Sequence, residues 1–289
     1  MSRLSTYPHA RWTATDISVA SVAPLLEQGR VVFLPDLPFV VEPSERDIFS
    51  PAILSSSKNT SYDPTTDRVG GTSLTGAPRD QLRNVLRRFS GAAASLVDQL
   101  LPEYRGRSVR RRASFRPAEI AGRQSSWRKD DTRLHLDAFP ASPTHGDRIL
   151  RVFSNVNPEG RARTWRVGED AEQVVERFAP VLSMPFPGIG ALLAALRVTK
   201  RVRKPYDALM LQLHDRMKQD TAYQNTCPQE RVDLQAGSTW MTFTDQVSHA
   251  AMAGQYQFEQ TFLVPVSAML DDTRSPLRVL ERATGRRLV

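Results

Sequence analysis

The most informative stretch of the chain reads His135-Leu-Asp-Ala-Phe-Pro140, and a strand-like segment, Arg148-Ile-Leu-Arg-Val-Phe-Ser-Asn-Val-Asn157, follows it closely. In an extended segment, residues two positions apart point to the same face, so His135 and Asp137 can converge on one point. A third ligand from a distant strand, His249, would complete a facial triad of two histidines and one carboxylate. This triad leaves coordination positions open for a co-substrate and oxygen, and it is typical of non-haem Fe(II) oxygenases.

Strand-like segments concentrate in the second half of the chain, with helical segments before and between them. Apolar residues at near-helical spacing predict a long helix over residues 78–101, which ends at Pro102. The other expected elements are helices over 15–30, 169–179, 188–220 (interrupted at Pro205) and 271–289, and strands over 31–34, 148–157, 239–245 and 256–266. We therefore predict a mainly β fold of the α+β class. Its core would be a double-stranded β-helix of the cupin or jelly-roll type, buttressed by helices, with a helical insertion between the metal-ligand strands.

No shift in composition divides the chain, so we expect one domain over residues 1–289, which is long enough to bury a sizeable core. Residues 1–108 would provide N-terminal helical support, and about 109–270 would form the barrel core. The segment 44–80 is rich in Ser, Thr, Asp, Pro and Gly, which predicts a long irregular stretch. Loops of this length in a compact domain are often functional, so this segment is a candidate lid over the site.

The composition, with 40% hydrophobic and 24% charged residues, is ordinary for a soluble protein. The single cysteine, Cys227, excludes an internal disulfide framework and favours a reducing compartment. The first residues lack the apolar core of a signal peptide, and the longest apolar run near the middle, 189–196, is too short to span a bilayer. We expect a cytoplasmic protein.

The net charge of +8 favours anionic partners. Basic residues gather in two clusters, 105–116 and 197–204. Proteins that bind nucleic acid usually interleave aromatic side chains for stacking on bases. The first cluster has aromatic residues only at its edges and the second has none, so we expect no nucleic acid partner. Both clusters also fit simple solvated faces.

An iron oxygenase that uses 2-oxoglutarate needs a cation for the distal carboxylate of that acid, and a guanidinium pairs well with it. The stretch after His249 where many such oxygenases carry this cation reads Phe258-Glu-Gln260 and has no base. The alternative place is the strand after the His-x-Asp pair, where Arg148 and Arg151 point to opposite faces. We favour Arg151, which lies in the middle of the strand, although an arginine on the outer face is the competing interpretation.

Four more residues are candidates for other roles. Gln260 and Thr261 are candidates for hydrogen bonds to the co-substrate, although strand polarity alone also explains them. His145 is a rival metal ligand, but its surroundings, Pro143-Thr-His-Gly146, are typical of a turn. His214 lies beside Asp215 on an expected helix, where it faces either solvent or the mouth of the site. There it is a candidate contact for the substrate.

The ordered string from His135 to Pro158 resembles the Kdo hydroxylase family. So do Leu213-His-Asp-Arg-Met-Lys218, Phe243-Thr-Asp-Gln-Val-Ser-His249 and, with Gly254 before it, Glu259-Gln-Thr-Phe262, so that the resemblance spans about residues 110–265. It implies an Fe(II)- and 2-oxoglutarate-dependent dioxygenase that uses O2, with metal ligands at His135, Asp137 and His249. It also implies hydroxylation at carbon 3 of 3-deoxy-D-manno-oct-2-ulosonic acid (Kdo) in the lipopolysaccharide inner core, on a Kdo–lipid A precursor, giving Ko, succinate and CO2.

Such a glycolipid is strongly anionic, which gives the basic surface a second interpretation. Trp127-Arg128-Lys129, just before the His-x-Asp pair, would face the sugar acid. The stretch 189–204 has apolar residues first and five cations after them, as in a helix that lies at the interface of an anionic membrane. A helix packed on the barrel with a solvated basic end is the alternative. We expect peripheral contact with the cytoplasmic face of the inner membrane, without anchoring.

Two other function classes share these features. A JmjC-like protein hydroxylase would use the same triad on a peptide, and the cation on the downstream strand is compatible with it. A non-enzymatic cupin-type module that binds lipid or sugar would use the His-Asp pair only for structure. Iron binding and the formation of succinate separate the enzymes from the module.

Overall fold

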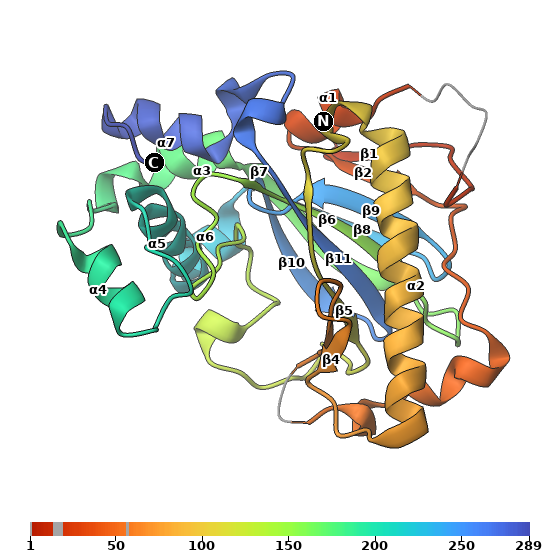
Figure 1. Cartoon of the computed structure of the whole chain (residues 1–289). Coiled ribbons are helices and arrows are strands. Elements are labelled where there is room, and N and C mark those ends of the chain that lie inside the picture. Colours follow the sequence, from red (N-terminus) through yellow and green to blue (C-terminus); the bar gives the residue numbers. More distant parts are fainter. Residues whose placement is uncertain (1, 14–19, 56–57) are drawn as a thin grey trace.

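Two β-sheets form the centre of the computed structural model, which describes residues 2–13, 20–55 and 58–289 (Figure 1). Within these residues, the main sheet has eight strands in the order β1-β2-β9-β6-β11-β5-β3-β4, and the second sheet has three in the order β10-β7-β8. Only β1 and β2 pair in parallel; the other pairs are antiparallel. The strands are β1 (Leu4–Thr6), β2 (Val31–Leu34), β3 (Thr60–Asp63), β4 (Arg68–Gly70), β5 (Val109–Arg116), β6 (Arg148–Asn155), β7 (Arg163–Asp170), β8 (Glu230–Leu234), β9 (Thr239–Phe243), β10 (Val247–Ala253) and β11 (Gln257–Val264).

The long helix α2 (Gly76–Leu100) lies across one face of the main sheet (Figure 1). Its apolar stripe packs on the sheet: the rings of Phe89 and Phe258 are stacked with centroids 5.2 Å apart, and Leu96 shares a core with Leu150 of β6. Burial of such a stripe is the main stabilising contribution to a surface helix. The helix ends where Pro102 begins the next short helix, as the sequence predicts.

A second group of helices packs beside the second sheet around a separate apolar core (Figure 1). Four of the helices lie in the chain between Asp137 and His249, which confirms the predicted helical insertion, and Pro205 begins a new helix, as predicted. The helices other than α2 are α1 (Ala23–Glu27), α3 (Ala171–Phe178), α4 (Ile189–Ala195), α5 (Pro205–Gln219), α6 (Thr221–Thr226) and α7 (Pro276–Thr284). The 3₁₀ helices are η1 (Pro43–Ile48), η2 (Pro51–Ile53), η3 (Pro102–Tyr104), η4 (Trp127–Lys129), η5 (Ala179–Val181), η6 (Val266–Ala268) and η7 (Asp272–Arg274).

The N-terminal region differs from the prediction of helical support over residues 1–108. It contributes α2, but also four strands, β1 to β4, to the main sheet. The helix expected over 15–30 is only the short α1 in the described part, and its proposed cap, Thr15-Asp16, lies outside the described residues. The segment 44–80 is not irregular throughout, because β3 pairs with β5 and with β4. Strands of three or four residues are too short to show alternation in the sequence.

All three strands of the second sheet, β7, β8 and β10, were absent from the sequence prediction. Strand β10 contains His249, so this histidine lies within a strand of its own that follows the predicted strand over 239–245. The segment Val-Ser-His-Ala-Ala-Met-Ala has small residues on both faces, so its sequence carries no clear alternation. The fold is a mixed structure of helices and large sheets, and the strands predicted over 148–157, 239–245 and 256–266 are all present.

Candidate metal centre

The side chains of His135, Asp137 and His249 meet at one point, where their ligand atoms all lie within 4.8 Å of one another. The backbone brings them together: the N–H of His135 donates to the carbonyl of His249 over 3.1 Å, and the N–H of His249 donates back over 3.0 Å. Two residues later, the N–H of Asp137 donates to the carbonyl of Thr244 over 2.8 Å. This extended backbone places His135 and Asp137 on the same side, as predicted from their spacing.

Hydrogen bonds to the backbone orient both imidazoles. Nδ1 of His135 lies 2.8 Å from the carbonyl oxygen of Arg133, and Nδ1 of His249 lies 3.0 Å from that of Val247. Because a carbonyl oxygen only accepts, each Nδ1 carries the proton and donates it. The lone pair of each Nε2 is then free for a metal, which is the usual arrangement of a metal-binding histidine. Trp165 of β7 stacks on the His249 ring with centroids 5.2 Å apart and fixes it further.

Burial and neighbouring charges set the protonation states of the triad. Burial lowers the pKa of His135 well below its usual range, and the charge of His249 lowers it further. Burial also lowers the pKa of His249. Burial alone would raise the pKa of Asp137, but Arg151 and the two histidines lower it overall. The site therefore holds two neutral imidazoles and one carboxylate at neutral pH, which are the forms that bind a divalent metal. This donor set fits Fe(II).

Arg151 lies on the inner face of β6 beside the triad, as predicted. Its Nη2 is 2.9 Å from Asp137 Oδ2, and its Nη1 donates to Glu259 Oε1 over 2.6 Å. Thr261 is the partner of Arg151 in the β6–β11 register and shares the inner face with Glu259. Arg151 and Thr261 are thus placed where a metal-bound ligand can reach them.

Two of the residues predicted to bind the co-substrate point away from the site, so these two predictions are wrong. Arg148 is fully buried on the opposite face, where its Nε donates to Asp245 Oδ2 over 2.8 Å. Gln260 is fully buried on the α2 side of β11, and its amide donates to the carbonyl of Arg111 over 2.8 Å. Both follow from strand geometry, since each lies an odd number of residues from Arg151 or Glu259, which face the triad.

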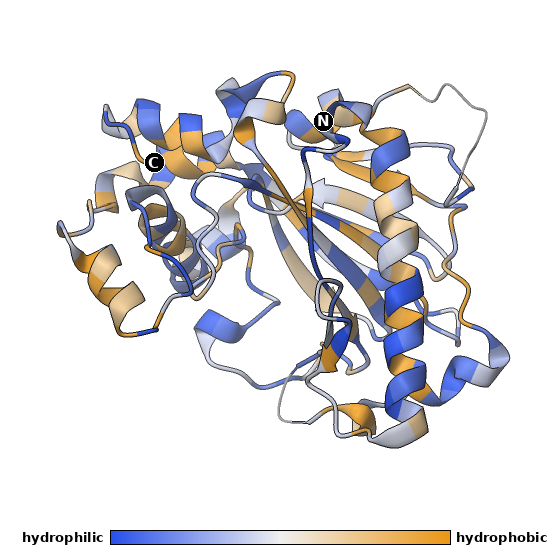
Figure 2. Cartoon of the chain, in the orientation of Figure 1, coloured by the Kyte–Doolittle hydropathy of each residue, from blue (hydrophilic) through white to orange (hydrophobic). Residues whose placement is uncertain are grey.

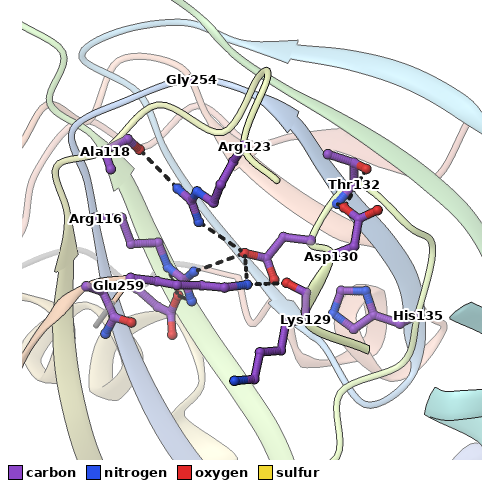
Figure 3. A network of polar contacts seen from close by, with 12 residues as sticks. Arg116, Ala118, Arg123, Lys129, Asp130, Thr132, His135, Gly254 and Glu259 are labelled. Atoms are coloured by element: carbon purple, nitrogen blue, oxygen red, sulfur yellow. Dashed lines mark hydrogen bonds and ion pairs between the residues drawn. The ribbon is translucent and has the colours of Figure 1, made fainter. Parts of the chain in front are cut away.

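A network of ion pairs joins the strands beside the triad (Figure 3). Glu259 accepts from Arg116 Nη2 over 3.0 Å on the side away from Arg151. Asp131 is 3.1 Å from Lys58 Nζ, 3.7 Å from Arg123 Nη1 and 4.0 Å from Arg116 Nη1. The sequence analysis missed this network because its members come from segments far apart in the chain. Glu259 in the middle of a buried strand was the one available signal.

Arg163 on β7 is a second buried guanidinium that the sequence analysis missed. Its Nη1 donates to the carbonyl of Gly254 over 3.2 Å, and no carboxylate of the described residues lies within ion-pair distance. Burial lowers the pKa of Arg163 to about 9, and the charge of Arg116 lowers it too. Trp165 lies on the same face of β7, between Arg163 and the level of His249.

The opposite side of the triad is formed by α5 and η4. The rings of His214 and His135 lie edge to face with centroids 5.3 Å apart. Asp215 bridges the two elements, because it lies 3.0 Å from His214 Nδ1 and 3.1 Å from Arg128 Nε. Arg128 also stacks on the ring of Trp127. The predicted substrate residues Trp127, Arg128, Lys129 and His214 are therefore brought together at one rim of the site.

His145 is not part of the triad, which agrees with the prediction of a turn residue. Its φ of 56° is typical of a tight turn, and its Nε2 lies 2.7 Å from the carbonyl oxygen of Val202. Arg201 contacts its other ring nitrogen over 3.0 Å. This histidine thus fastens the basic segment 197–204 to the body of the protein.

Comparisons with known proteins point to one family. The sequence profile of the 3-deoxy-D-manno-oct-2-ulosonic acid (Kdo) hydroxylases matches residues 10–287. The chain is 42% identical to the Kdo hydroxylase KdoO, described as a non-haem Fe(II) α-ketoglutarate-dependent dioxygenase, in its cobalt(II) complex (TM-score 0.97, covering 100% of this chain and 98% of that one). The complex of KdoO with α-ketoglutarate and Fe(III) is similar at the same identity (TM-score 0.95, 99% and 97%), as is that with succinate and Fe(III) (TM-score 0.96, 100% and 98%). No curated protein sequence matches the chain.

Proposed function

The chain belongs to the Kdo hydroxylase family, and we propose that it is an Fe(II)- and 2-oxoglutarate-dependent dioxygenase that hydroxylates Kdo. The observation that carries this proposal is the triad itself: two imidazoles with free Nε2 atoms and one carboxylate, all within 4.8 Å. A solved relative with 42% identity over the whole chain is described as a dioxygenase of this type. The same match argues against a peptide hydroxylase or a non-enzymatic module.

His135, Asp137 and His249 would hold the iron. When bound, iron with 2-oxoglutarate and O2 supplies an oxidant that hydroxylates an unactivated C–H bond while 2-oxoglutarate is converted to succinate and CO2. The residues of the chain contribute placement. The carbonyls of Arg133 and Val247 fix the imidazole rings, and the apolar face of Trp165 shields one of them from water.

We propose that two cations bind the co-substrate. Arg151 of β6 lies beside the metal ligands, and Arg163 is a second, buried cation on β7. Arg151 already contacts the metal-ligand carboxylate of Asp137, so it can respond directly to an anion that joins the metal. Arg163 is buried and has no carboxylate partner in the ranges that the structure describes, which leaves its charge available. Thr261 lies beside Arg151 and would add a hydroxyl. A guanidinium can pair with a carboxylate through two parallel hydrogen bonds.

For the substrate, we propose carbon 3 of a Kdo residue on a Kdo–lipid A precursor, with Ko as the product. The family supports the sugar, and the position and the lipid follow from the resemblance described above. The test is mass spectrometry of lipopolysaccharide core from cells that express this chain. A gain of one oxygen atom on Kdo is expected, and its absence despite abundant folded protein would contradict the substrate.

We also propose that the two sheets form a distorted double-stranded β-helix. Support comes from a core that the two sheets share, in which Trp165 and Val247 of the second sheet pack with Phe153 and Trp240 of the main sheet. Strand β10 of the second sheet also carries His249, which forms a bridge with His135. Strand β9 leads, through the turn at Asp245 and Gln246, directly from the main sheet into β10 of the second. A fold of this kind brings metal ligands from both sheets to one point.

We propose that the segment 181–204, here called the α4 surface, contacts an anionic membrane. The described part of the chain has twelve exposed large apolar side chains, and eight of them lie in this one segment. Phe186 is the most exposed, at 86%, and Figure 2 colours most of α4 hydrophobic. The eight are Val181, Met184, Phe186, Ile189, Leu192, Leu196, Val198 and Val202. A contiguous apolar patch of this kind on a protein surface usually marks a contact site.

The charge of the α4 surface indicates which partner fits it. Arg197, Lys200, Arg201 and Lys204 are exposed and Arg203 is half-buried, and none of the five has a carboxylate within ion-pair distance among the described residues. Exposed apolar side chains beside unpaired cations match the acyl and head-group layers of an anionic bilayer. In the ranges that the structure describes, no helix is both long and apolar enough to cross a membrane. We therefore propose peripheral contact on the cytoplasmic face of the inner membrane.

A further inference from the structure

Lys218 is a buried cation without a counter-ion. It lies on α5, only 2% of its surface is exposed, and its ammonium makes one hydrogen bond, to the carbonyl oxygen of Arg128 over 3.2 Å. An ammonium group has three N–H donors, so two of them lack a partner among the described residues. No carboxylate in the described ranges lies within ion-pair distance of Nζ. A buried charge without a partner is destabilising, so its presence needs a reason.

Three other cations around the site have carboxylate partners, whereas Lys218 shares with Arg163 the lack of such a partner among the described residues. Arg148 pairs with Asp245 over 2.8 Å, and Arg116 and Arg151 both pair with Glu259. Asp131 and Asp137 are the nearest negative charges to Lys218, but they already contact Lys58 and Arg151 respectively. The charge of Lys218 is therefore available to an anion that enters the site.

The position of Lys218 is close to the metal ligands. It lies one helical turn after His214, whose ring contacts that of His135, so both side chains project from the same face of α5. The positive charge of Lys218 lowers the pKa of both His135 and His249, which places it within electrostatic reach of the triad. The co-substrate candidates Arg151 and Arg163 belong to β6 and β7, on the strand side of the triad. Lys218 thus occupies the side that the co-substrate does not need.

The chemistry of the proposed substrate requires a cation at this place. In Kdo, the carboxylate carbon and carbon 3 are both bonded to carbon 2. When carbon 3 is presented to the metal, the carboxylate must lie beside the metal as well, and not at the outer rim. Arg128 and Lys129 are exposed on η4, so they suit the outer parts of the glycolipid, such as its phosphates.

We propose that Lys218 binds the carboxylate of the sugar acid and thereby directs carbon 3 to the metal, with His214 beside it on α5. This inference rests on the proposed function. The carboxylate fills the two unused donors of the ammonium and supplies its missing counter-ion. Lys218 is in this account a substrate-binding residue that also sets the position of hydroxylation.

The test compares Lys218→Met, which keeps the side-chain length and removes the charge, with Arg216→Met, which removes an exposed cation from the same helix. The two substrates are the Kdo–lipid A precursor and the same glycolipid with the Kdo carboxylate converted to its methyl ester. For Lys218→Met, kcat/KM for the acid falls about 10- to 100-fold, the size expected for a hydrogen bond between charged groups. The wild-type protein loses a similar factor on the ester, and Lys218→Met loses no more on it.

Three further measurements separate a substrate contact from a structural role. KM for 2-oxoglutarate and the affinity for Co(II) stay unchanged in Lys218→Met, and its melting temperature is equal to or above that of the wild type, because an uncompensated buried charge has gone. A lower melting temperature, a raised KM for 2-oxoglutarate, or an equal further loss on the ester overturns the inference. If the wild type hydroxylates the acid and Lys218→Met does so equally well, only this inference fails. If the wild type hydroxylates neither substrate, the proposed function fails with it.

Discussion

The metal centre and the α4 surface are built in opposite ways. The metal centre collects buried side chains from segments more than a hundred residues apart, and most of its charges are paired. The α4 surface is one continuous segment of the chain in which apolar side chains are exposed and five cations lack a carboxylate partner within the described part of the chain. Under the proposed function, the first region would hydroxylate the sugar and the second would hold the protein to the membrane that contains the lipid.

The largest effect is expected from removal of a metal ligand. His135→Ala takes away one of three ligands, so Co(II) binding is lost and product formation falls to background. His145→Ala is the matched control, since this histidine lies in a turn outside the triad, and it retains metal binding. Isothermal titration with Co(II) measures both. Retention of stoichiometric metal binding by His135→Ala would show that the triad is assigned wrongly.

The two arginines of β6 give the next largest effect and test the faces of the strand. Arg151→Ala raises KM for 2-oxoglutarate about 10- to 100-fold, because a charged hydrogen-bonding partner of the co-substrate is lost. Arg148→Ala leaves that KM unchanged but lowers the free energy of unfolding by about 3–5 kcal/mol, because Asp245 is left buried and unpaired. Steady-state kinetics and denaturant unfolding separate the two. The opposite pattern would reverse the assignment of inner and outer faces.

A change of pH is expected to have an intermediate effect on the affinity for metal. The pKa of both triad histidines lies below 6.5, so the imidazoles remain neutral as pH falls through the range where an ordinary histidine becomes protonated. Co(II) affinity should therefore stay constant from neutral pH down to pH 6.5 and decline only below it. The metal-free protein should likewise lose stability only as pH falls below 6.5, where the unfolded chain binds more protons. A steady decline in affinity from neutral pH downward would contradict the lowered pKa values.

The smallest effect is expected at the α4 surface. Phe186→Asp removes the most exposed apolar side chain, so binding to vesicles of anionic lipid weakens about tenfold. This corresponds to about 1.4 kcal/mol, near the lower end of the about 1.5–3 kcal/mol for burial of one large apolar side chain. Leu270→Asp changes an exposed apolar residue elsewhere and serves as the control. Co-sedimentation measures binding. Activity on detergent-solubilised substrate stays unchanged in both variants. Equal vesicle binding by the wild type and Phe186→Asp would contradict the proposal that the α4 surface contacts the membrane.

Features of both regions that depend on local geometry could be predicted from the sequence. The triad and the inward direction of Arg151 depend on local geometry, in which residues two apart share a face, and both predictions of position are confirmed. The exposed apolar stretch before the cations at 197–204 is also a local pattern. The metal role of the triad agrees with its protonation states. The binding roles of the other candidates stay predictions: Arg151, Thr261, Trp127, Arg128, Lys129 and His214.

Features that depend on tertiary pairing were not predictable. Glu259, Arg163 and Lys218 are charged residues whose burial only the assembled sheets and α5 determine. Strands β3 and β4 are short, and β3 depends on its pairing with β5, so the segment 44–80 was interpreted as irregular. Alternation places Arg148 and Arg151 on opposite faces of β6, but only the assembled sheets show which face of β6 and of β11 meets the metal. Arg148 and Gln260 were therefore wrong as co-substrate contacts.

The most direct test of the central claim is a single reaction of the purified protein with Fe(II), 2-oxoglutarate, O2 and a Kdo–lipid A precursor, in which succinate and glycolipid are quantified together. The account predicts one molecule of succinate for each molecule of glycolipid that gains one oxygen atom, with neither product formed by His135→Ala. Hydroxylated glycolipid without succinate would contradict it, as would a protein that binds metal at the triad and forms succinate but never alters Kdo.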